Sequence, residues 1–143
     1  MLARQPELAN CYVELRGELG AGKTSFARHL LQALGVTGRI KSPTYAVVEP
    51  YTVAHAPGVD EPLAVWHFDF YRFDDPSEWE DAGFREIFAS AGLKLAEWPQ
   101  KAHGMLPVPD LALSISVLDD DSRSVRLSAA TPTGAALLRA ACP

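Results

Sequence analysis

One eight-residue stretch carries the residue types that bind the phosphates of a nucleotide. Residues 17–24 read Gly-Glu-Leu-Gly-Ala-Gly-Lys-Thr and match the pattern G-x-x-x-x-G-K-[ST] at every fixed position. Glycines allow positive φ here and leave no Cβ to hold a phosphate away from the backbone N–H groups. In such a loop Lys23 reaches the β- and γ-phosphates, and the Thr24 hydroxyl ligates Mg²⁺. The sequence therefore predicts a nucleotide phosphate site.

The predicted phosphate-binding residues all belong to this loop and to the start of the segment after it. They are Gly17, Gly20, Ala21, Gly22, Lys23, Thr24 and Ser25. The loop needs a strand before it and a helix after it, because the helix N-terminus attracts the phosphate.

The flanking segments have the required periodicity. Residues 11–16 alternate apolar and polar side chains, which predicts a strand. Glu14 and Arg16 indicate that one face of this strand is partly open to solvent. Residues 26–34 place apolar side chains at helical spacing, and Gly35 is a typical helix stop.

The remainder of the chain predicts further strands and helices. Two neighbouring strands, predicted to be antiparallel, and three later strands are expected over 45–49, 63–71, 93–98, 111–117 and 123–127. The last two of these should form a hairpin through the acidic turn at 119–122. Helices are expected from Asp74 to about Gly83, continuing through Phe88 and ended by Gly92, and over 133–141.

Composition indicates one domain with an ordinary core. At 143 residues the chain can bury a sizeable core without disulfides or metal. Its formal net charge of −5 argues against a broad basic face for nucleic acid. Cys11 and Cys142 have no metal-type or redox spacing and fit a reducing cytosol. No apolar run approaches the roughly 20 residues of a membrane span, so we expect a cytoplasmic protein without a membrane partner.

Two carboxylates are candidates for the second acid that a phosphate loop needs near Mg²⁺. Glu97 ends a short predicted strand, and the carboxyl ends of strands face the ligand crevice in open α/β sheets. Asp69 shares a face with His67 and Tyr71 by strand alternation. From spacing alone, Asp69 could be a metal ligand, a water-orienting base or a surface carboxylate, and Glu97 could likewise be structural.

Four motifs occur in a fixed order along the chain. They are the loop at 17–24, Lys-Ser-Pro-Thr-Tyr at 41–45, His-Phe-Asp-Phe-Tyr-Arg at 67–72 and Leu-Ala-Glu-Trp-Pro at 95–99. Together they resemble the TsaE family, bacterial P-loop ATPases required for the threonylcarbamoyladenosine modification of tRNA. The resemblance spans roughly residues 11–127, and its last three motifs are far more specific than the loop alone.

The resemblance implies a fold, an activity and partners. The fold would be a P-loop NTPase-like three-layer α/β fold with a mixed central sheet, formed by residues 1–143 as one domain. The activity would be Mg²⁺-dependent ATP hydrolysis, slow in isolation. The partners would be the TsaB–TsaD proteins, which modify the adenosine next to the anticodon, so that tRNA is met only through that complex.

The resemblance also implies roles for matching residues. Lys23 would contact the phosphates and assist catalysis, while Thr24 and Glu97 would hold Mg²⁺. Asp69 resembles the essential acid of the family. Thr44 resembles a switch residue near the γ-phosphate.

Two further residues have family counterparts. Trp98 resembles the tryptophan beside the metal-site acid, although packing alone would also explain it. Arg123 resembles an arginine near the nucleotide.

Three departures from the family pattern restrict what can be transferred. Only about ten residues precede Cys11, so we expect the usual N-terminal helix to be truncated or missing, and adenine contacts cannot be assigned. Gln100 stands where an acid is common, which leaves its role open. Tyr45 replaces a frequent phenylalanine, a mild change.

Other functions fit the same loop. A small-molecule kinase would need an acceptor pocket and an arginine-rich lid, and the arginines here are scattered. A binding module could hold the nucleotide without turning it over. A regulatory GTPase is disfavoured because the sequence has no Asn-Lys-x-Asp motif.

Overall fold

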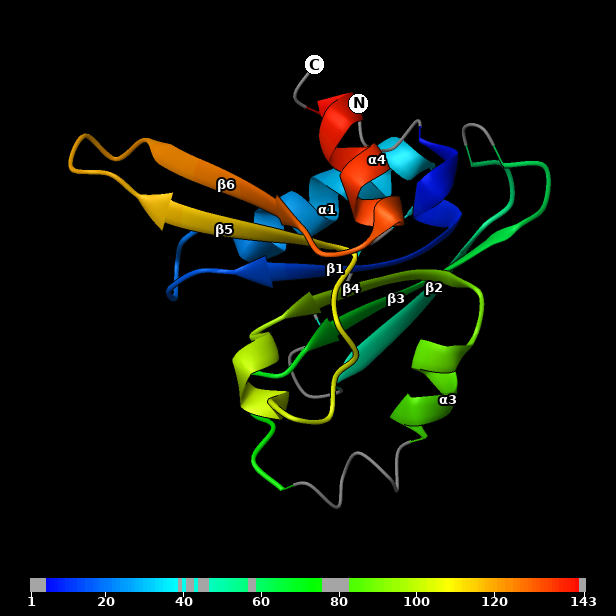
Figure 1. Ribbon diagram of the computed structural model, residues 1–143, viewed down its shortest axis with the longest axis horizontal. Helices are drawn as coiled ribbons and strands as arrows, with labels where there is room; N and C mark the ends of the chain where they lie inside the picture. The colour runs from blue at the N-terminus through cyan, green and yellow to red at the C-terminus, as the bar shows by residue number, and fades with distance from the viewer. Residues whose placement is uncertain are drawn as a thin grey trace.

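The protein is built on a six-stranded sheet with the strand order β2-β3-β4-β1-β5-β6 (Figure 1). The computed structural model describes residues 5–38, 40, 43, 47–56, 59–75 and 83–141. The strands are β1 (Asn10–Arg16), β2 (Val48–Val53), β3 (Leu63–Asp69), β4 (Gly92–Glu97), β5 (Leu111–Val117) and β6 (Arg123–Ala129). The four inner strands are parallel and both edge strands are antiparallel, which confirms the predicted mixed sheet.

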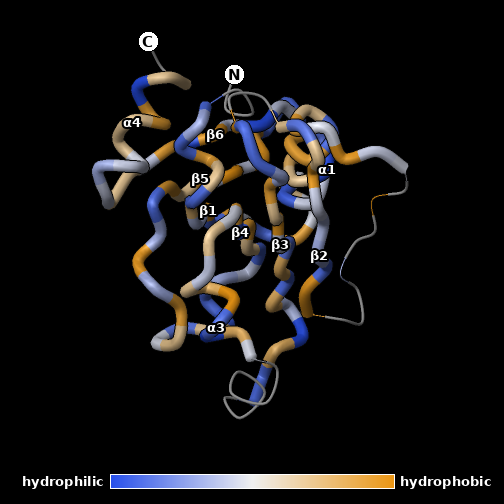
Figure 2. The backbone as a smooth tube through the Cα atoms, turned by 90° about the vertical axis from the view of Figure 1, so that its right-hand side faces the viewer, coloured by the Kyte–Doolittle hydropathy of each residue, from blue (hydrophilic) through white to orange (hydrophobic). Residues whose placement is uncertain are grey.

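Helices cover both faces of the sheet (Figures 1 and 2). They are α1 (Lys23–Leu34), α3 (Phe84–Ala89) and α4 (Pro132–Ala141), with short 3-10 helices η2 (Pro6–Ala9) and η3 (Pro99–Ala102). The figures place α1 and α4 on one side of the strands and α3 on the other. The predicted three-layer α/β fold is therefore confirmed. Among the residues that the structure describes, no helix is long and apolar enough to cross a membrane.

Each face of the sheet has its own hydrophobic core. The face under α1 and α4 is aliphatic, with Leu31 and Leu137 packed on strand residues such as Leu95. The opposite face is aromatic, and the Phe68 ring lies 5.4 Å from that of Phe84. Odd-numbered residues of β3 face the aliphatic side because strand side chains alternate. That side is also the face on which Asp69 lies.

The predicted open face of β1 is wrong at Glu14. This residue is only 5% exposed, because the Tyr12 hydroxyl donates a hydrogen bond to Glu14 Oε2 at 2.7 Å and Arg16 pairs with the other oxygen. These two donors replace water around the carboxylate. A charged residue inside a buried strand is tolerated when such partners lie two residues away on the same face.

Element boundaries differ from the predicted ones in a few places. The strand expected at 45–49 begins at Val48 within the described part of the chain, and β2 and β3 pair antiparallel as predicted. Gly92 begins β4 and does not end the helix, which stops at Ala89. The helix expected between Asp74 and Gly83 falls on 76–82, outside the described residues.

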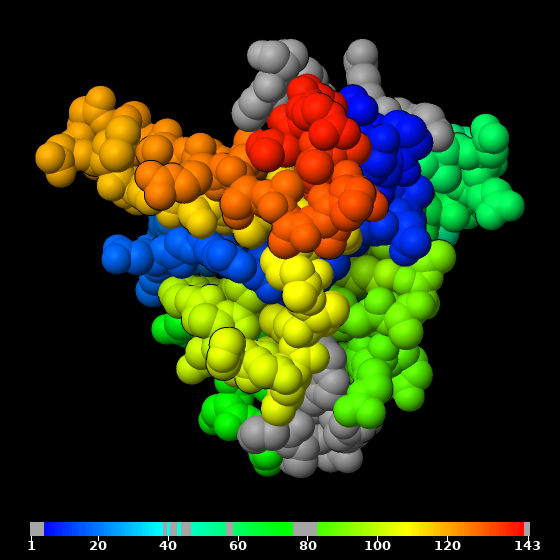
Figure 3. All heavy atoms as spheres, in the orientation of Figure 1, coloured from blue at the N-terminus to red at the C-terminus, as the bar shows by residue number. Residues whose placement is uncertain are grey.

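The hairpin formed by β5 and β6 projects from the body of the protein (Figures 1 and 3). Val117, Leu118 and Val125 are 48%, 47% and 50% exposed on it. The base of the hairpin packs against the rest of the fold through Leu113, whereas its outer half has few buried side chains.

Cys11 is buried in the aliphatic core, which leads to a prediction about its reactivity. Burial, followed by the nearby Asp110 carboxylate, raises the pKa of the thiol to about 12. At pH 8 the thiolate fraction should therefore be about 10⁻⁴, far below that of an ordinary thiol. We expect iodoacetamide to leave Cys11 unmodified in the folded Cys142→Ser variant, as measured by mass spectrometry. The same variant in urea should be alkylated, and rapid modification without urea would contradict the prediction.

Candidate functional site

The glycine-rich loop joins β1 to α1, at the carboxyl end of the parallel strands. Gly17 directly follows β1 and has a φ of +153°. A Cβ at this position would lie 2.5 Å from the carbonyl oxygen of Ile115 on β5. The neighbouring strand therefore requires glycine at the entrance to the loop.

The helix after the loop begins without a side-chain cap. Gly22 precedes α1 in the left-handed conformation and has no side chain with which to cap the first-turn N–H groups. These N–H groups have no partner inside the helix, so the N-terminus attracts an anion. Thr24 and Ser25 lie in this first turn. Together with the loop before it, this geometry fits a phosphate.

Lys23 is folded back onto the loop. Its Nζ donates hydrogen bonds to the carbonyl oxygens of Gly17 at 2.5 Å and of Glu18 at 2.9 Å, and lies 4.1 Å from the centre of the Trp98 ring. Burial lowers the pKa of the Lys23 ammonium, and the carboxylates of Glu97 and Asp69 oppose this shift. The ammonium is thus held at the loop by neutral oxygens and an aromatic face.

Glu97 connects the end of β4 to the first turn of α1. Its Oε1 accepts a hydrogen bond from the Thr24 hydroxyl at 2.8 Å, and its Oε2 lies 2.7 Å from Nε2 of His67. The Glu97 residue is only 2% exposed. The two residues that the family resemblance assigns to Mg²⁺ are therefore in direct contact.

Asp69 lies opposite Glu97 in the parallel ladder between β3 and β4. Its Oδ1 accepts the backbone N–H of Tyr71 at 3.0 Å. Burial raises the pKa of the Asp69 carboxyl; the Tyr71 N–H opposes this, and the Glu97 charge adds to it. Sheet pairing fixes these two acids side by side, and neighbouring strands are about 4.8 Å apart.

An open hollow of about 280 Å³ brings these groups together. Trp98 adopts the left-handed conformation with φ 55°, and its ring centre lies 5.0 Å from that of Tyr71, so both rings form one wall. The residues that line the hollow are Leu19, Gly20, Gly22, Lys23, Thr24, Ser25, Asp69, Tyr71, Glu97 and Trp98.

Arg123 lies beside this hollow and not in its lining. Arg123 begins β6 and reaches the loop from the side, where its Nε donates to the Ala21 carbonyl at 3.1 Å. It therefore supports the loop backbone and does not line the hollow. Thr44 lies outside the described residues, as do most of the 41–45 motif and Tyr45.

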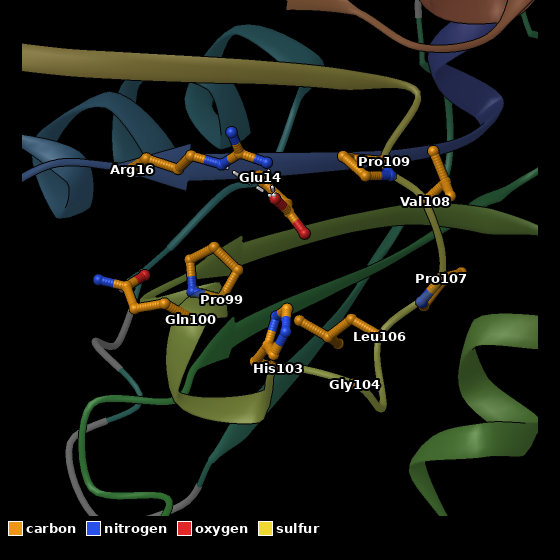
Figure 4. A pocket seen from close by; sticks show the side chains of 10 residues that line it. All are labelled: Glu14, Arg16, Pro99, Gln100, His103, Gly104, Leu106, Pro107, Val108 and Pro109. Atoms are coloured by element: carbon orange, nitrogen blue, oxygen red, sulfur yellow. Dashed lines mark hydrogen bonds and ion pairs between the residues drawn. The ribbon is translucent and has the colours of Figure 1, made fainter.

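A second hollow, of about 600 Å³, shares no lining residue with the first (Figure 4). It is lined by residues of β1, of η3 and of the segment from His103 to Pro109, and Glu14 points into it from β1. Arg16 donates two hydrogen bonds to Glu14 Oε1, at 2.6 and 3.1 Å, so the carboxylate is already paired. Gln100 lines this hollow and so lies away from the phosphate loop.

Sequence reasoning gave no role to His67 and Tyr71. Alternation along the predicted strand at 63–71 put both on one face with Asp69, which was the available signal, whereas β3 ends at Asp69 and Tyr71 follows it in a turn. Their contacts with Glu97 and Trp98 cross from one strand end to the next. Such contacts depend on the register of β3 against β4, which cannot be predicted from the sequence.

The donor set fits a metal completed by a bound nucleotide. Thr24 and Glu97 provide a hydroxyl and a carboxylate oxygen 2.8 Å apart, and both are ligand types that Mg²⁺ takes. Within the described ranges, no group of three His, Cys, Asp or Glu side chains could hold a metal by itself. Mg²⁺ is usually held by one or two protein groups, substrate phosphates and water, so two donors are sufficient.

The fold and the site place this chain in the P-loop class of α/β proteins. Over residues 1–125 the sequence matches the family model described as "Threonylcarbamoyl adenosine biosynthesis protein TsaE". The chain belongs to the TsaE family, which acts in tRNA threonylcarbamoyladenosine biosynthesis. The resemblance drawn from the four motifs is thereby confirmed.

Relatives and a solved structure are consistent with this family. The chain is 41% identical to the tRNA threonylcarbamoyladenosine biosynthesis protein TsaE of Haemophilus influenzae over 128 residues, 90% of this chain and 76% of that protein. It is 36% identical to the TsaE protein of Bacillus subtilis over 115 residues, 80% of this chain and 67% of that protein. The crystal structure of Bacillus subtilis YdiB is similar with a TM-score of 0.70 and 26% identity, over 97% of this chain and 83% of that chain.

Proposed function

We propose that the protein is an Mg²⁺-dependent ATPase that acts as an accessory switch in the threonylcarbamoyl modification of tRNA. It works in the cytoplasm with TsaB–TsaD, which transfer the group to the adenosine next to the anticodon, and it meets tRNA through them. Membership of the TsaE family supports the pathway. The observation that supports ATPase activity is the hydrogen bond between Thr24 and Glu97 at the mouth of the phosphate loop.

Phosphate binding rests on the loop and on Lys23. The ammonium exchanges the carbonyl oxygens of Gly17 and Glu18 for phosphate oxygens, which carry full negative charge and are stronger acceptors. The first-turn N–H groups of α1 bind the same phosphates. Arg123 keeps the loop backbone in place through the Ala21 carbonyl.

The hydrolytic step uses the two acids differently. Thr24 and Glu97 would hold Mg²⁺, which would supply charge neutralisation at the phosphates. Asp69 positions or deprotonates the attacking water, and its raised pKa brings it nearer to that of an effective base. Trp98 and Tyr71 form the wall beside them.

The switch is assigned to the segment before β2. Thr44 in the Ser-Pro-Thr motif senses the γ-phosphate, and hydrolysis removes that contact. In other P-loop proteins γ-phosphate contacts order such loops, and their loss resets partner binding. This assignment rests on the motif resemblance at 41–45.

Phosphate release by the purified protein, with and without TsaB–TsaD, tests the proposal. We expect stimulation by the partners. Lys23→Ala should lower ATP affinity by about 10² or more because it removes the charge at the phosphates, and Glu97→Ala should weaken the Mg²⁺ dependence. Arg28→Ala, an exposed change on the same helix, is the matched control.

Three outcomes would contradict the proposed ATPase activity. They are unchanged hydrolysis in both the Lys23 and Glu97 variants, label from the γ-phosphate recovered on a metabolite, and tight ATP retention without phosphate release even with TsaB–TsaD. The second result would indicate a small-molecule kinase. The third would indicate a nucleotide that is bound but not turned over.

A further inference from the structure

His67 is a buried polar residue that the proposed chemistry does not use. It is 1% exposed and lies on β3, two residues before Asp69 and on the same face. Its Nε2 is 2.7 Å from Oε2 of Glu97. His67 thus contacts the carboxylate oxygen of Glu97 that Thr24 does not contact.

The environment of the ring determines which nitrogen carries the proton. Nδ1 of His67 is buried and has no hydrogen-bond partner among the residues that the structure describes. A carboxylate only accepts, so Nε2 must donate to Glu97. A neutral ring protonated at Nε2 meets this requirement and leaves Nδ1 as an unpaired acceptor, without burying an unpaired N–H.

Glu97 is therefore held at both of its oxygens. His67 donates to Oε2 and Thr24 donates to Oε1, which fixes the plane of the carboxylate. A metal ion bound at Thr24 and Glu97 would compete for the Oε1 contact. The His67 hydrogen bond would then remain to orient the carboxylate, as outer hydrogen bonds do for metal ligands elsewhere.

We propose that His67 is a positioning residue that fixes the Glu97 carboxylate so that Oε1 faces Thr24 and the Mg²⁺ of the nucleotide complex. This inference rests on the proposed function, because it needs Mg²⁺ at that pair. The same strand supplies both His67 and Asp69, so β3 sets the position of the water-activating acid and of the metal-site acid together.

Two substitutions of His67 separate the effect of its hydrogen-bond donor from the effect of its side-chain volume. His67→Gln keeps an N–H at a similar reach, whereas His67→Leu fills the space without a donor. ATP affinity is measured by calorimetry in excess Mg²⁺ and again in excess EDTA, with thermal unfolding followed in parallel. His67→Leu should weaken binding in Mg²⁺ by about 10- to 100-fold and leave binding in EDTA unchanged, while His67→Gln stays within about threefold of the parent.

Two controls distinguish positioning from a general effect on the fold. His29→Leu changes an exposed histidine on α1 and should leave both affinities unchanged. In a Glu97→Gln background, His67→Leu should cause no further loss of Mg²⁺-dependent affinity, because the residue acts through Glu97. If His67→Leu does not fold, His67→Asn, whose shorter amide stops short of Glu97, is measured in its place and read in the same way.

Several results would overturn the inference. They are unchanged Mg²⁺-dependent affinity in the folded His67 variant, equal losses in Mg²⁺ and EDTA, and an equal loss in the Glu97→Gln background. If the ATP affinity of the parent protein is the same in Mg²⁺ and in EDTA, the proposed function is contradicted as well. The two failures are thus distinguishable in one experiment.

Discussion

Replacement of Asp69 by asparagine is expected to lower ATP hydrolysis in the presence of TsaB–TsaD by about 10²–10⁴-fold, the usual contribution of a positioned general base. The amide keeps the shape of the side chain, and its oxygen can still accept the Tyr71 N–H. ATP affinity should therefore change by less than about twofold if the residue acts in the transition state. Single-turnover phosphate release and calorimetry measure the two quantities. Asp60→Asn, at an exposed loop acid, is the matched control.

The same variant should be more stable than the parent protein at neutral pH. Burial raises the pKa of Asp69 above its ordinary value of 3.8, so folding disfavours the charged form. A raised folded pKa contributes stability at low pH that is lost as the pH rises through the folded value. The melting temperatures of the two nucleotide-free proteins should thus converge below pH 3.8 and separate above it, with Asp69→Asn higher. A parent protein that is equally stable or more stable at pH 7 would contradict this.

Replacement of Gly134 by alanine is the second large effect, and it acts on the fold. In an ordinary helix interior Gly→Ala stabilises by about 1 kcal/mol. Here the added Cβ would lie 1.6 Å from the carbonyl oxygen of Asp110 and 3.3 Å from the Cβ of Ala129. We expect a loss of about 3 kcal/mol or more, with helix α4 displaced from the β5–β6 base.

The obstructing carbonyl cannot move away at low cost. The Asp110 carbonyl accepts the Ala130 N–H, and the Asp110 N–H donates to the Tyr12 carbonyl. The Asp110 carboxylate accepts the Tyr12 N–H at 2.8 Å and the Thr131 hydroxyl at 2.6 Å. Urea unfolding of the Gly134→Ala variant, compared with the Ala136→Gly variant as a control, measures the loss of stability. Ala136→Gly should lose about 1 kcal/mol by helix propensity alone. A stabilised Gly134→Ala would show that α4 shifts freely.

The local chemistry of the loop was predictable from the sequence because its positions are contiguous. The glycines within residues 17–24 determine the backbone conformation of the loop. The strand and helix beside the loop are predicted from short-range periodicity. Glu97 was found because it ends a predicted strand, and Asp69 because alternation placed it on one face with His67 and Tyr71; the structure puts both acids at strand ends. The parallel pairing that puts them opposite each other required the structure.

Contacts between distant segments were not predictable. The burial of Glu14 depends on Tyr12 and Arg16 taking the place of water, and alternation alone indicated an open face. His67 gave no signal of its contact with Glu97, because a buried histidine is commonly a satisfied core residue. The left-handed conformation of Trp98 likewise follows from its place between β4 and η3, not from its side chain.

The projecting hairpin has a consequence for self-association. Strand β6 lies at the edge of the sheet, and exposed edge strands with apolar side chains such as Val125 are templates for pairing with another chain. Charged side chains at the turn, 119–121, and along β6 at Arg123 and Arg126 make such pairing unfavourable. We therefore expect these charges to disfavour edge-to-edge aggregation, a role in solubility that is separate from folding and from the nucleotide site.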